Sequence, residues 1–191
     1  MWGGTPQPGV VKINFDGSYV NSFATGVFLL RDWMGKVLKV GAANYGHASS
    51  LVAEARALKN GVCLAIQAGH TNIDIEGDSL IVIQALKGKF HIPWQIANII
   101  EDLHSWFQQG IPVTITHIFR EANMAADWLS KFAHSLTDKF ITDLCFFPFL
   151  SQIIADDLIR RTLAKRGVWS SIYLFTSGKK TKKNNIYTAF F

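Results

Sequence analysis

Apolar and polar residues alternate along the first third of the chain with a period of two, which is typical of half-buried β-strands. The pattern predicts three strands in succession, at residues 11–18, 25–32 and 36–43. Gly35 supplies turn chemistry before the third of them. Three short strands joined by tight turns favour an antiparallel meander.

The apolar period then changes from two to between three and four, which predicts an amphipathic helix over residues 51–68. Beyond it the pattern predicts a strand at 71–78, a short helix capped by Ser79, a helix from Pro93 to about Gln108, a strand at 112–119 and a last helix at 121–136. This order predicts an α/β fold, in which a mixed five-stranded sheet of three antiparallel and then parallel strands is flanked by helices.

The 191 residues suffice for one domain with an appendage. We expect a flexible lead-in at 1–9, the domain at 10–137, and a C-terminal extension at 138–191 that is partly helical and then a basic tail. The net charge of +5 is weak evidence for a nucleic-acid partner, because residues 1–137 hold ten basic and ten acidic side chains.

Other protein classes are disfavoured by what the sequence lacks. No apolar run approaches the length that spans a bilayer, so no membrane partner is expected. The N-terminus has no secretory pattern, which predicts an intracellular protein, in the nucleus or the cytoplasm. Cys63 and Cys145 have no cysteine or histidine at ligand spacing, so they predict neither a zinc site nor a disulfide framework.

Four carboxylates lie where a simple fold would not place them. Glu54 falls between Leu51 and Leu58 in the apolar seam of the first helix, where a charge is disfavoured unless something pairs or binds it. The alternative is a glutamate at the edge of the seam that reaches water.

The other three acids each have an ordinary explanation when taken alone. Asp16 closes the first strand before a glycine, as in a common turn. Asp78 follows the fourth strand and would complement the dipole of the next helix. Asp127 lies among small residues of the last helix, where a solvated or packing role is common.

Together the four acids predict a metal site. Two come from strand ends and two from helices that pack on the sheet, and sites collect where strands end. Clustered carboxylates repel each other, and a divalent cation relieves that repulsion. An all-oxygen ligand set favours Mg²⁺ or Mn²⁺, and two such ions would suit phosphoryl displacement.

The stretches VKINFDGS, LVAEARAL, IEGDS and HIFREANMAADWLS resemble the ribonuclease H family, in particular its plant and retroelement-derived branch. The resemblance runs from about Val10 to Ala133, and the successive acids are 38, 24 and 49 residues apart. The family's RNase H-like order of strands and helices also matches the predicted order.

The resemblance implies a metal-dependent endonuclease that hydrolyses the RNA strand of RNA–DNA hybrids and leaves a 3′-hydroxyl and a 5′-phosphate. It makes Asp16, Glu54, Asp78 and Asp127 the catalytic, metal-binding acids, with two Mg²⁺ or Mn²⁺ ions. His117 would assist proton movement, although a strand-end histidine bonded to backbone is an equal alternative. The residues implied to contact the hybrid are Gly17, Ser18, Ser49, Ser50, Ser79 and Asn123, the last with a cap or structural role as its alternative.

The sequence also departs from the family pattern. The second strand is bulkier near Phe23 and Phe28, and the segment 88–110, where relatives carry a basic, tryptophan-rich handle, is only weakly basic. Residues 144–166 are expected to dock back as a helix, and GKKTKKNN is a basic run that suits a solvated tail.

Three other functions compete with the enzyme. A retroelement-derived module could bind nucleic acid with catalysis weak or lost, but it would gain nothing from four repelling acids. A 3′–5′ exonuclease would carry Asp-x-Glu on the first strand, where this chain has Asp16-Gly17-Ser18. A protein-binding scaffold is favoured only by the many aromatic residues. We expect a monomer.

Overall fold

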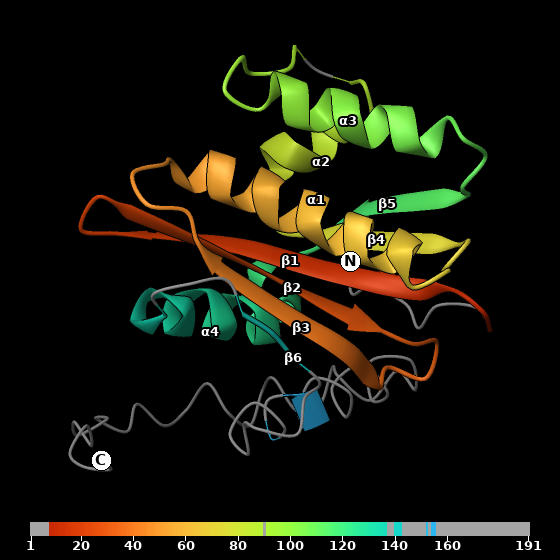
Figure 1. Cartoon of the computed structure of the whole chain (residues 1–191), viewed down its shortest axis with the longest axis horizontal. Helices are drawn as coiled ribbons and strands as arrows, with labels where there is room; N and C mark the ends of the chain where they lie inside the picture. Colours follow the sequence, from red (N-terminus) through yellow and green to blue (C-terminus); the bar gives the residue numbers. More distant parts are fainter. Residues whose placement is uncertain (1–7, 90, 137–139, 143–151, 153, 156–191) are drawn as a thin grey trace, which may run out of the picture.

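The computed structural model describes residues 8–89, 91–136, 140–142, 152, 154 and 155 (Figure 1). The elements are β1 (Val11–Val20), β2 (Phe23–Arg31), β3 (Val37–Asn44), α1 (Ser50–Gln67), β4 (Ile73–Gly77), α2 (Leu80–Leu86), α3 (Ala97–Phe107), β5 (Val113–His117), α4 (Met124–Phe132) and β6 (Phe140–Thr142). Short 3-10 turns at Arg120–Ala122 and Ala133–Ser135 flank α4. Every strand and helix predicted for residues 10–137 is present in the predicted order.

The strands form one mixed sheet in the order β5-β4-β1-β2-β3-β6. β1, β2 and β3 pair antiparallel, and β4 and β5 continue from β1 in parallel. The five predicted strands and their directions are thereby confirmed. A sixth strand, β6, pairs antiparallel with β3, so the sheet continues past residue 137 into the segment assigned to the extension.

Helices cover both faces of the sheet, with α1, α2 and α3 on one and α4 on the other (Figure 1). The period of two along the strands explains this arrangement, because Ile13 and Phe15 face the first layer while Val27 and Leu29 face the second. No helix among the described residues has both the length and the apolar character to cross a membrane.

Part of the C-terminal extension belongs to the second layer. Ile154 is buried against β2, β3 and α4, and Gln152, Ile154 and Ala155 have helical backbone. The rest of the segment 144–166 and the basic run GKKTKKNN lie outside the described residues, as does Cys145.

Two helices begin later than predicted. Pro93 does not open α3, because Ile96 N donates to Pro93 O (3.0 Å) in a turn and the helix begins at Ala97. The last helix begins at Met124 rather than at residue 121, since Arg120–Ala122 forms a separate 3-10 turn.

β1 is longer than predicted and runs on to Val20, where it joins β2 in a tight hairpin. The two turn residues, Asn21 and Ser22, have φ of 50° and 69°. Two successive positive φ values match the right-handed twist of paired strands, which is why such short hairpins form.

A buried ion pair joins β1 to β4. Lys12 is 1% exposed and contacts Glu76, which is 2% exposed, and its Nζ lies 3.2 Å from Asp74 Oδ2. Removing Glu76 takes away the more deeply buried of these two carboxylates and leaves the buried Lys12 charge less well compensated, which costs several kcal/mol.

We therefore expect Glu76→Ala to lower the free energy of unfolding by about 3 kcal/mol in urea titrations. Asp102→Ala is the matched control, because it breaks the half-exposed pair of Asp102 with Lys59 and should cost less than about 1 kcal/mol. Equal losses for the two variants would contradict this account of the pair.

Candidate active site

The parallel strands bring two acids together at one edge of the sheet. Phe15, Gly77 and His117 are aligned across β1, β4 and β5, so Asp16 and Asp78 follow side by side on neighbouring strands. Asp16 lies inside β1, paired with Val27, which is why the turn interpretation of this residue is wrong.

Glu54 reaches the same place because α1 rests on two glycines. Gly17 and Gly26 face each other across β1 and β2. A Cβ on Gly17 would lie 2.8 Å from Glu54 N, and one on Gly26 would lie 2.6 Å from Ala53 O. Only glycine permits this close approach, which sets the first turns of α1 directly over Gly17, the neighbour of Asp16.

Asp127 comes from α4 on the opposite face. Ser130, one turn later in that helix, is 1% exposed and donates from Oγ to Asp16 Oδ2 (2.7 Å). Asp127 thereby lies near enough to Asp16 for their charges to interact. All four predicted acids converge on one region.

Burial and mutual repulsion act on two of these acids. Burial raises the pKa of Asp16 to about 6, and the charges of Asp78 and Asp127 act in the same direction. The hydrogen bond from Ser130 acts to lower this pKa. Burial likewise raises the pKa of Glu54 to about 7, assisted by Asp16 and Asp78 and opposed by a hydrogen bond from Ser79 Oγ. Among the residues that the structure describes, neither carboxylate forms an ion pair at contact distance.

Asp127 is the exception, because it has cations of its own. Burial acts to raise its pKa, but hydrogen bonds from Lys131 Nζ (2.6 Å) and Arg120 Nε (2.8 Å) outweigh burial and lower it. Both partners are well exposed, so each ion pair contributes little stability and can be exchanged for another cation.

The raised pKa values give the metal-free protein a defined pH dependence. A carboxyl whose pKa is higher in the folded state stabilises the fold below its unfolded value, here 3.8 for Asp16 and 4.5 for Glu54. That contribution is lost as the pH rises through about 6 and about 7.

In a chelator, the wild-type protein is therefore expected to lose stability between about pH 4 and pH 7 relative to a Glu54→Gln variant. Denaturant titrations at several pH values measure the difference. If the two curves stay parallel throughout that range, Glu54 is not held in the environment described here.

Two other predicted residues have clear contacts. Ser79 lies at the N-terminal cap of α2 but makes no side-chain cap bond, because its hydroxyl donates to Glu54. Asn123 does not cap α4 with its side chain either. Its buried Nδ2 donates to Phe15 O and Asp78 Oδ1 (both 2.9 Å), so it holds Asp78 against β1.

His117 lies beside the acids rather than among them. Its Nε2 is 3.2 Å from the backbone oxygen of Asp78, which is the backbone contact that the sequence left as an equal alternative. Its role in proton movement stays a prediction.

The small residues predicted to contact a hybrid surround the acids. Ser18 Oγ lies 3.1 Å from His134 Nε2, and Ser49 Oγ accepts from Val52 N (3.2 Å) as the cap of α1. Gly17 packs against Ser50 O and Glu54. Contact with a nucleic acid remains a prediction for each of them.

Sequence reasoning did not single out three residues that act on the site: Ser130, Arg120 and Lys131. Ser130 and Lys131 follow Asp127 by three and four residues, so helical spacing places them on its face. Arg120 contacts Asp127 from a 3-10 turn, which the hydrophobic periodicity of the sequence does not predict.

The residues present suit a hard divalent cation. Asp16, Glu54, Asp78 and Asp127 offer only carboxylate oxygens, which Mg²⁺ and Mn²⁺ prefer. In the described part of the chain no three acidic, histidine or cysteine side chains are already grouped as a metal site. Each of the four carboxylates instead accepts a hydrogen bond from a protein donor. The donors to Asp127 are the cations Arg120 and Lys131, whose place a metal ion could take, whereas the other three acids accept from neutral donors.

Comparison with known proteins identifies the class to which this fold and these acids belong. A model of the reverse transcriptase-like family matches residues 14–133, and the chain belongs to this family, whose fold is ribonuclease H-like. The match contains all four acids.

The individual proteins to which this chain is similar are named as ribonuclease H proteins. The chain is 27% identical over 164 residues to an Arabidopsis thaliana protein named "Putative ribonuclease H protein"; the match covers 85% of this chain and 26% of that protein, so the chain spans about a quarter of its length. RNase H1 of the halophilic archaeon Halobacterium salinarum superposes with a TM-score of 0.61 at 25% identity, over 65% of this chain and 97% of that one. LC11-RNase H1, solved with an RNA/DNA hybrid, superposes with a TM-score of 0.57 at 20% identity, over 62% and 92%.

Proposed function

We propose that this protein is a divalent-metal-dependent endonuclease that hydrolyses the RNA strand of RNA–DNA hybrids. The observation that carries the proposal is the convergence of Asp16, Glu54, Asp78 and Asp127, two of them with pKa values raised by burial and mutual repulsion. A protein gains nothing from such repulsion unless a cation relieves it.

The chain's residues have distinct roles in this proposal. The four acids hold Mg²⁺ or Mn²⁺, which when bound activates water and stabilises the charge that develops on the phosphate. Ser130 orients Asp16, Ser79 orients Glu54 and Asn123 orients Asp78.

Recognition of the hybrid would fall to the surrounding small residues. Ser18 and Ser50 flank the acids on β1 and α1, and short polar side chains with nearby backbone groups can read the 2′-hydroxyl that distinguishes RNA from DNA. LC11-RNase H1, which has the same fold, was solved in complex with an RNA/DNA hybrid, and this supports the same ligand class here. We also propose that the protein acts as an intracellular monomer.

One observation favours a second candidate, a nucleic-acid-binding module with weak catalysis. Arg120 and Lys131 both pair with Asp127 and would compete with a metal ion for it. Such a module would bind hybrids without turnover.

The deciding experiment follows a labelled RNA strand in a hybrid, in double-stranded RNA and as a single strand, with magnesium and with a chelator. The enzyme proposal predicts magnesium-dependent cleavage of the hybrid alone, ending in 3′-hydroxyl products. Binding of the hybrid without cleavage would establish the second candidate, and cleavage of all three RNAs alike would reject the substrate class.

A further inference from the structure

A buried network on the α4 side of the sheet ends at a histidine to which the proposed mechanism gives no role. Thr25 of β2 is fully buried, and its Oγ1 donates to Ser130 O (2.7 Å). The same Oγ1 lies 3.2 Å from His134 Nε2, which in turn lies 3.1 Å from Ser18 Oγ. These four residues, Ser18, Thr25, Ser130 and His134, are called the Thr25 network below.

The Thr25 network joins two strands to the end of α4. Ser18 and Thr25 are direct partners across β1 and β2. Ser130 lies in α4, and His134 follows it by four residues in the 3-10 turn that continues this helix. A spacing of four residues places both side chains over the same pair of strands.

The hydrogen bonds determine which nitrogen of His134 carries a hydrogen. A threonine hydroxyl has one hydrogen, and Thr25 donates it to Ser130 O. Thr25 Oγ1 can therefore only accept from His134, so Nε2 carries a hydrogen that it directs at the two hydroxyl oxygens. Burial also lowers the pKa of His134, which favours the neutral ring with a single hydrogen.

This tautomer determines what Ser18 can do. Because His134 Nε2 donates, Ser18 Oγ accepts, and the hydroxyl hydrogen of Ser18 is left for another acceptor. The same tautomer excludes a serine–histidine nucleophilic pair, in which Nε2 would have to accept the hydroxyl hydrogen. Ser18 is therefore an oriented hydrogen-bond donor.

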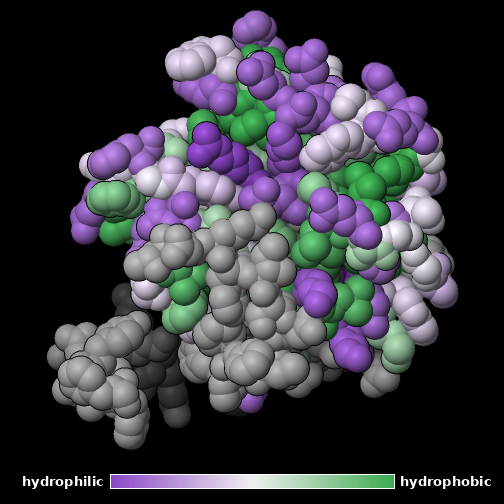
Figure 2. Space-filling view, viewed as in Figure 1, coloured by the Kyte–Doolittle hydropathy of each residue, from purple (hydrophilic) through white to green (hydrophobic). Residues whose placement is uncertain are grey.

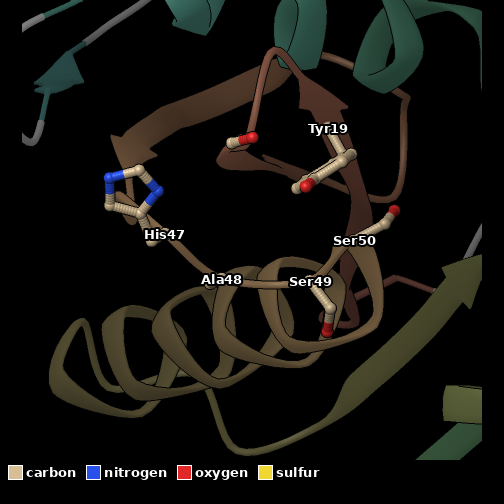
Figure 3. A pocket seen from close by; sticks show the side chains of 6 residues that line it. Tyr19, His47, Ala48, Ser49 and Ser50 are labelled. Carbon is tan, nitrogen blue, oxygen red and sulfur yellow. The ribbon is translucent and has the colours of Figure 1, made fainter.

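Ser18 lies beside the acids and faces α4. It follows Asp16 by two residues, so the two side chains share one face of β1, about 7 Å apart along the strand. In Figure 3 Tyr19, the next residue, points into a cavity that it lines with His47 and Ser49, and Ser18 faces the opposite way. Ser18 is half-buried, and hydrophilic and hydrophobic side chains share the surface at this end of the molecule (Figure 2).

The network also holds Asp16. Ser130, whose backbone oxygen accepts from Thr25, donates from its own Oγ to Asp16 Oδ2 (2.7 Å). Thr25 therefore ties the Asp16 carboxylate and the Ser18 donor to one buried point. A donor that is already oriented loses less entropy on meeting a ligand than a hydroxyl that rotates freely.

We propose that His134 and Thr25 are positioning residues, which hold the Ser18 hydroxyl as a hydrogen-bond donor to a backbone oxygen of the RNA strand beside the cleaved phosphate. The acceptor is a 2′-oxygen or a phosphate oxygen, since the RNA backbone offers both. This inference rests on the proposed function for its ligand, whereas the tautomer of His134 can be measured without any substrate.

A double-mutant cycle tests the positioning. His134→Ala and Ser18→Ala are each expected to lower kcat/KM for hybrid cleavage about tenfold, as for one lost hydrogen bond. Because His134 acts through Ser18, the double variant should lose no more than either single variant. His134→Gln, which keeps an N–H donor, should restore most of the activity. His104→Ala is the matched control, because it removes a half-buried histidine of α3 that contacts Leu86 O, and it should leave cleavage unchanged.

Modified hybrids identify the acceptor oxygen. Replacing one 2′-hydroxyl near the cleavage site by hydrogen, or one phosphate oxygen by a methyl group, should weaken cleavage by the wild-type protein about tenfold at the contacted position. Ser18→Ala and His134→Ala should be insensitive to the replacement at that position. The series in which this happens shows whether the acceptor belongs to a sugar or to a phosphate.

A third measurement is independent of catalysis. Nuclear magnetic resonance of protein labelled with nitrogen-15 histidine reports which ring nitrogen carries the hydrogen, and His134→Gln assigns the signal. The wild-type ring of His134 should be neutral with its hydrogen on Nε2 at neutral pH, and Thr25→Val should mix the two tautomers. A wild-type ring with its hydrogen on Nδ1 would overturn the inference.

The outcomes separate the inference from the proposed function. If the losses of His134→Ala and Ser18→Ala multiply in the double variant, or if Ser18→Ala stays sensitive to every modified position, the inference is overturned while the nuclease stands. If the wild-type protein cleaves no hybrid, the nuclease fails and the role of Ser18 toward RNA fails with it, while the resonance measurement still decides the orientation of His134.

Discussion

Asp16→Asn is expected to slow hybrid cleavage about a thousandfold, which corresponds to about 4 kcal/mol of lost transition-state stabilisation. The replacement preserves the shape of the side chain and an oxygen that can accept from Ser130. What it removes is the negative charge at the centre of the acid cluster. Steady-state cleavage in magnesium measures the loss.

The same variant should gain stability when no metal is present. Burial and the neighbouring acids disfavour a charged Asp16, so Asn in its place should stabilise the metal-free fold by about 2 kcal/mol at neutral pH. A protein that is more stable yet inactive has not simply misfolded.

Asp32→Asn is the matched control for this prediction. Asp32 lies in the β2–β3 turn, where its Oδ1 accepts from Met34 N and Lys36 N, as an asparagine oxygen also can. Cleavage should change less than twofold. Comparable losses for both variants would mean that the charge of Asp16 has no special part in the reaction.

Gly26→Ala is expected to reduce cleavage about a hundredfold, although Gly26 contributes no chemical group. The new Cβ would lie 2.6 Å from Ala53 O, a backbone atom that cannot rotate aside, so α1 must lift from the sheet. Glu54 is the next residue and would move with it, and a displacement of about 1 Å in a catalytic group can cost this much. The strain should also cost about 2 kcal/mol of unfolding free energy.

Gly61→Ala provides the control, since Gly61 lies in α1 at the same interface between this helix and the sheet. Its Cβ would meet side-chain atoms of Ile13 and Phe28 at 3.0–3.1 Å, and alanine favours the helix. Cleavage should stay within about twofold of wild type. An active Gly26→Ala protein would show that Glu54 does not need its present position.

The sequence was sufficient for five of the six strands and for their directions. Alternation in β1 and the switch to a helical period in α1 are strong local signals, because side chains repeat every two residues in a strand and every three to four in a helix. The expectation of a half-buried first strand is wrong, since residues 11–16 are buried on both faces between the two helix layers. The position of Glu54 inside an apolar seam marked it as unusual, and the structure places α1 against Gly17 and Gly26, which brings Glu54 close enough to Asp16 for their charges to interact. Its part in a metal site stays a prediction.

The partners of the acids were less predictable, because they depend on three-dimensional packing. Ser79 has the position of a helix cap, yet its hydroxyl turns to Glu54, 25 residues away in the chain. Arg120 reaches Asp127 only because a 3-10 turn precedes α4. Pro93 suggested the start of a helix, but it lies in a turn and the helix begins at Ala97. Proline is compatible with both structures.

In the proposed enzyme, four acids from separate elements share divalent cations in the folded protein. The melting temperatures of the wild-type protein and of Asp16→Asn, followed while magnesium or manganese is added from a metal-free start, test this sharing. An ion held by the native acids raises the melting temperature progressively with its concentration. The melting temperature of the wild type should rise and that of the variant should change little, whereas equal shifts in both proteins, or none in either, would show that these acids hold no cation.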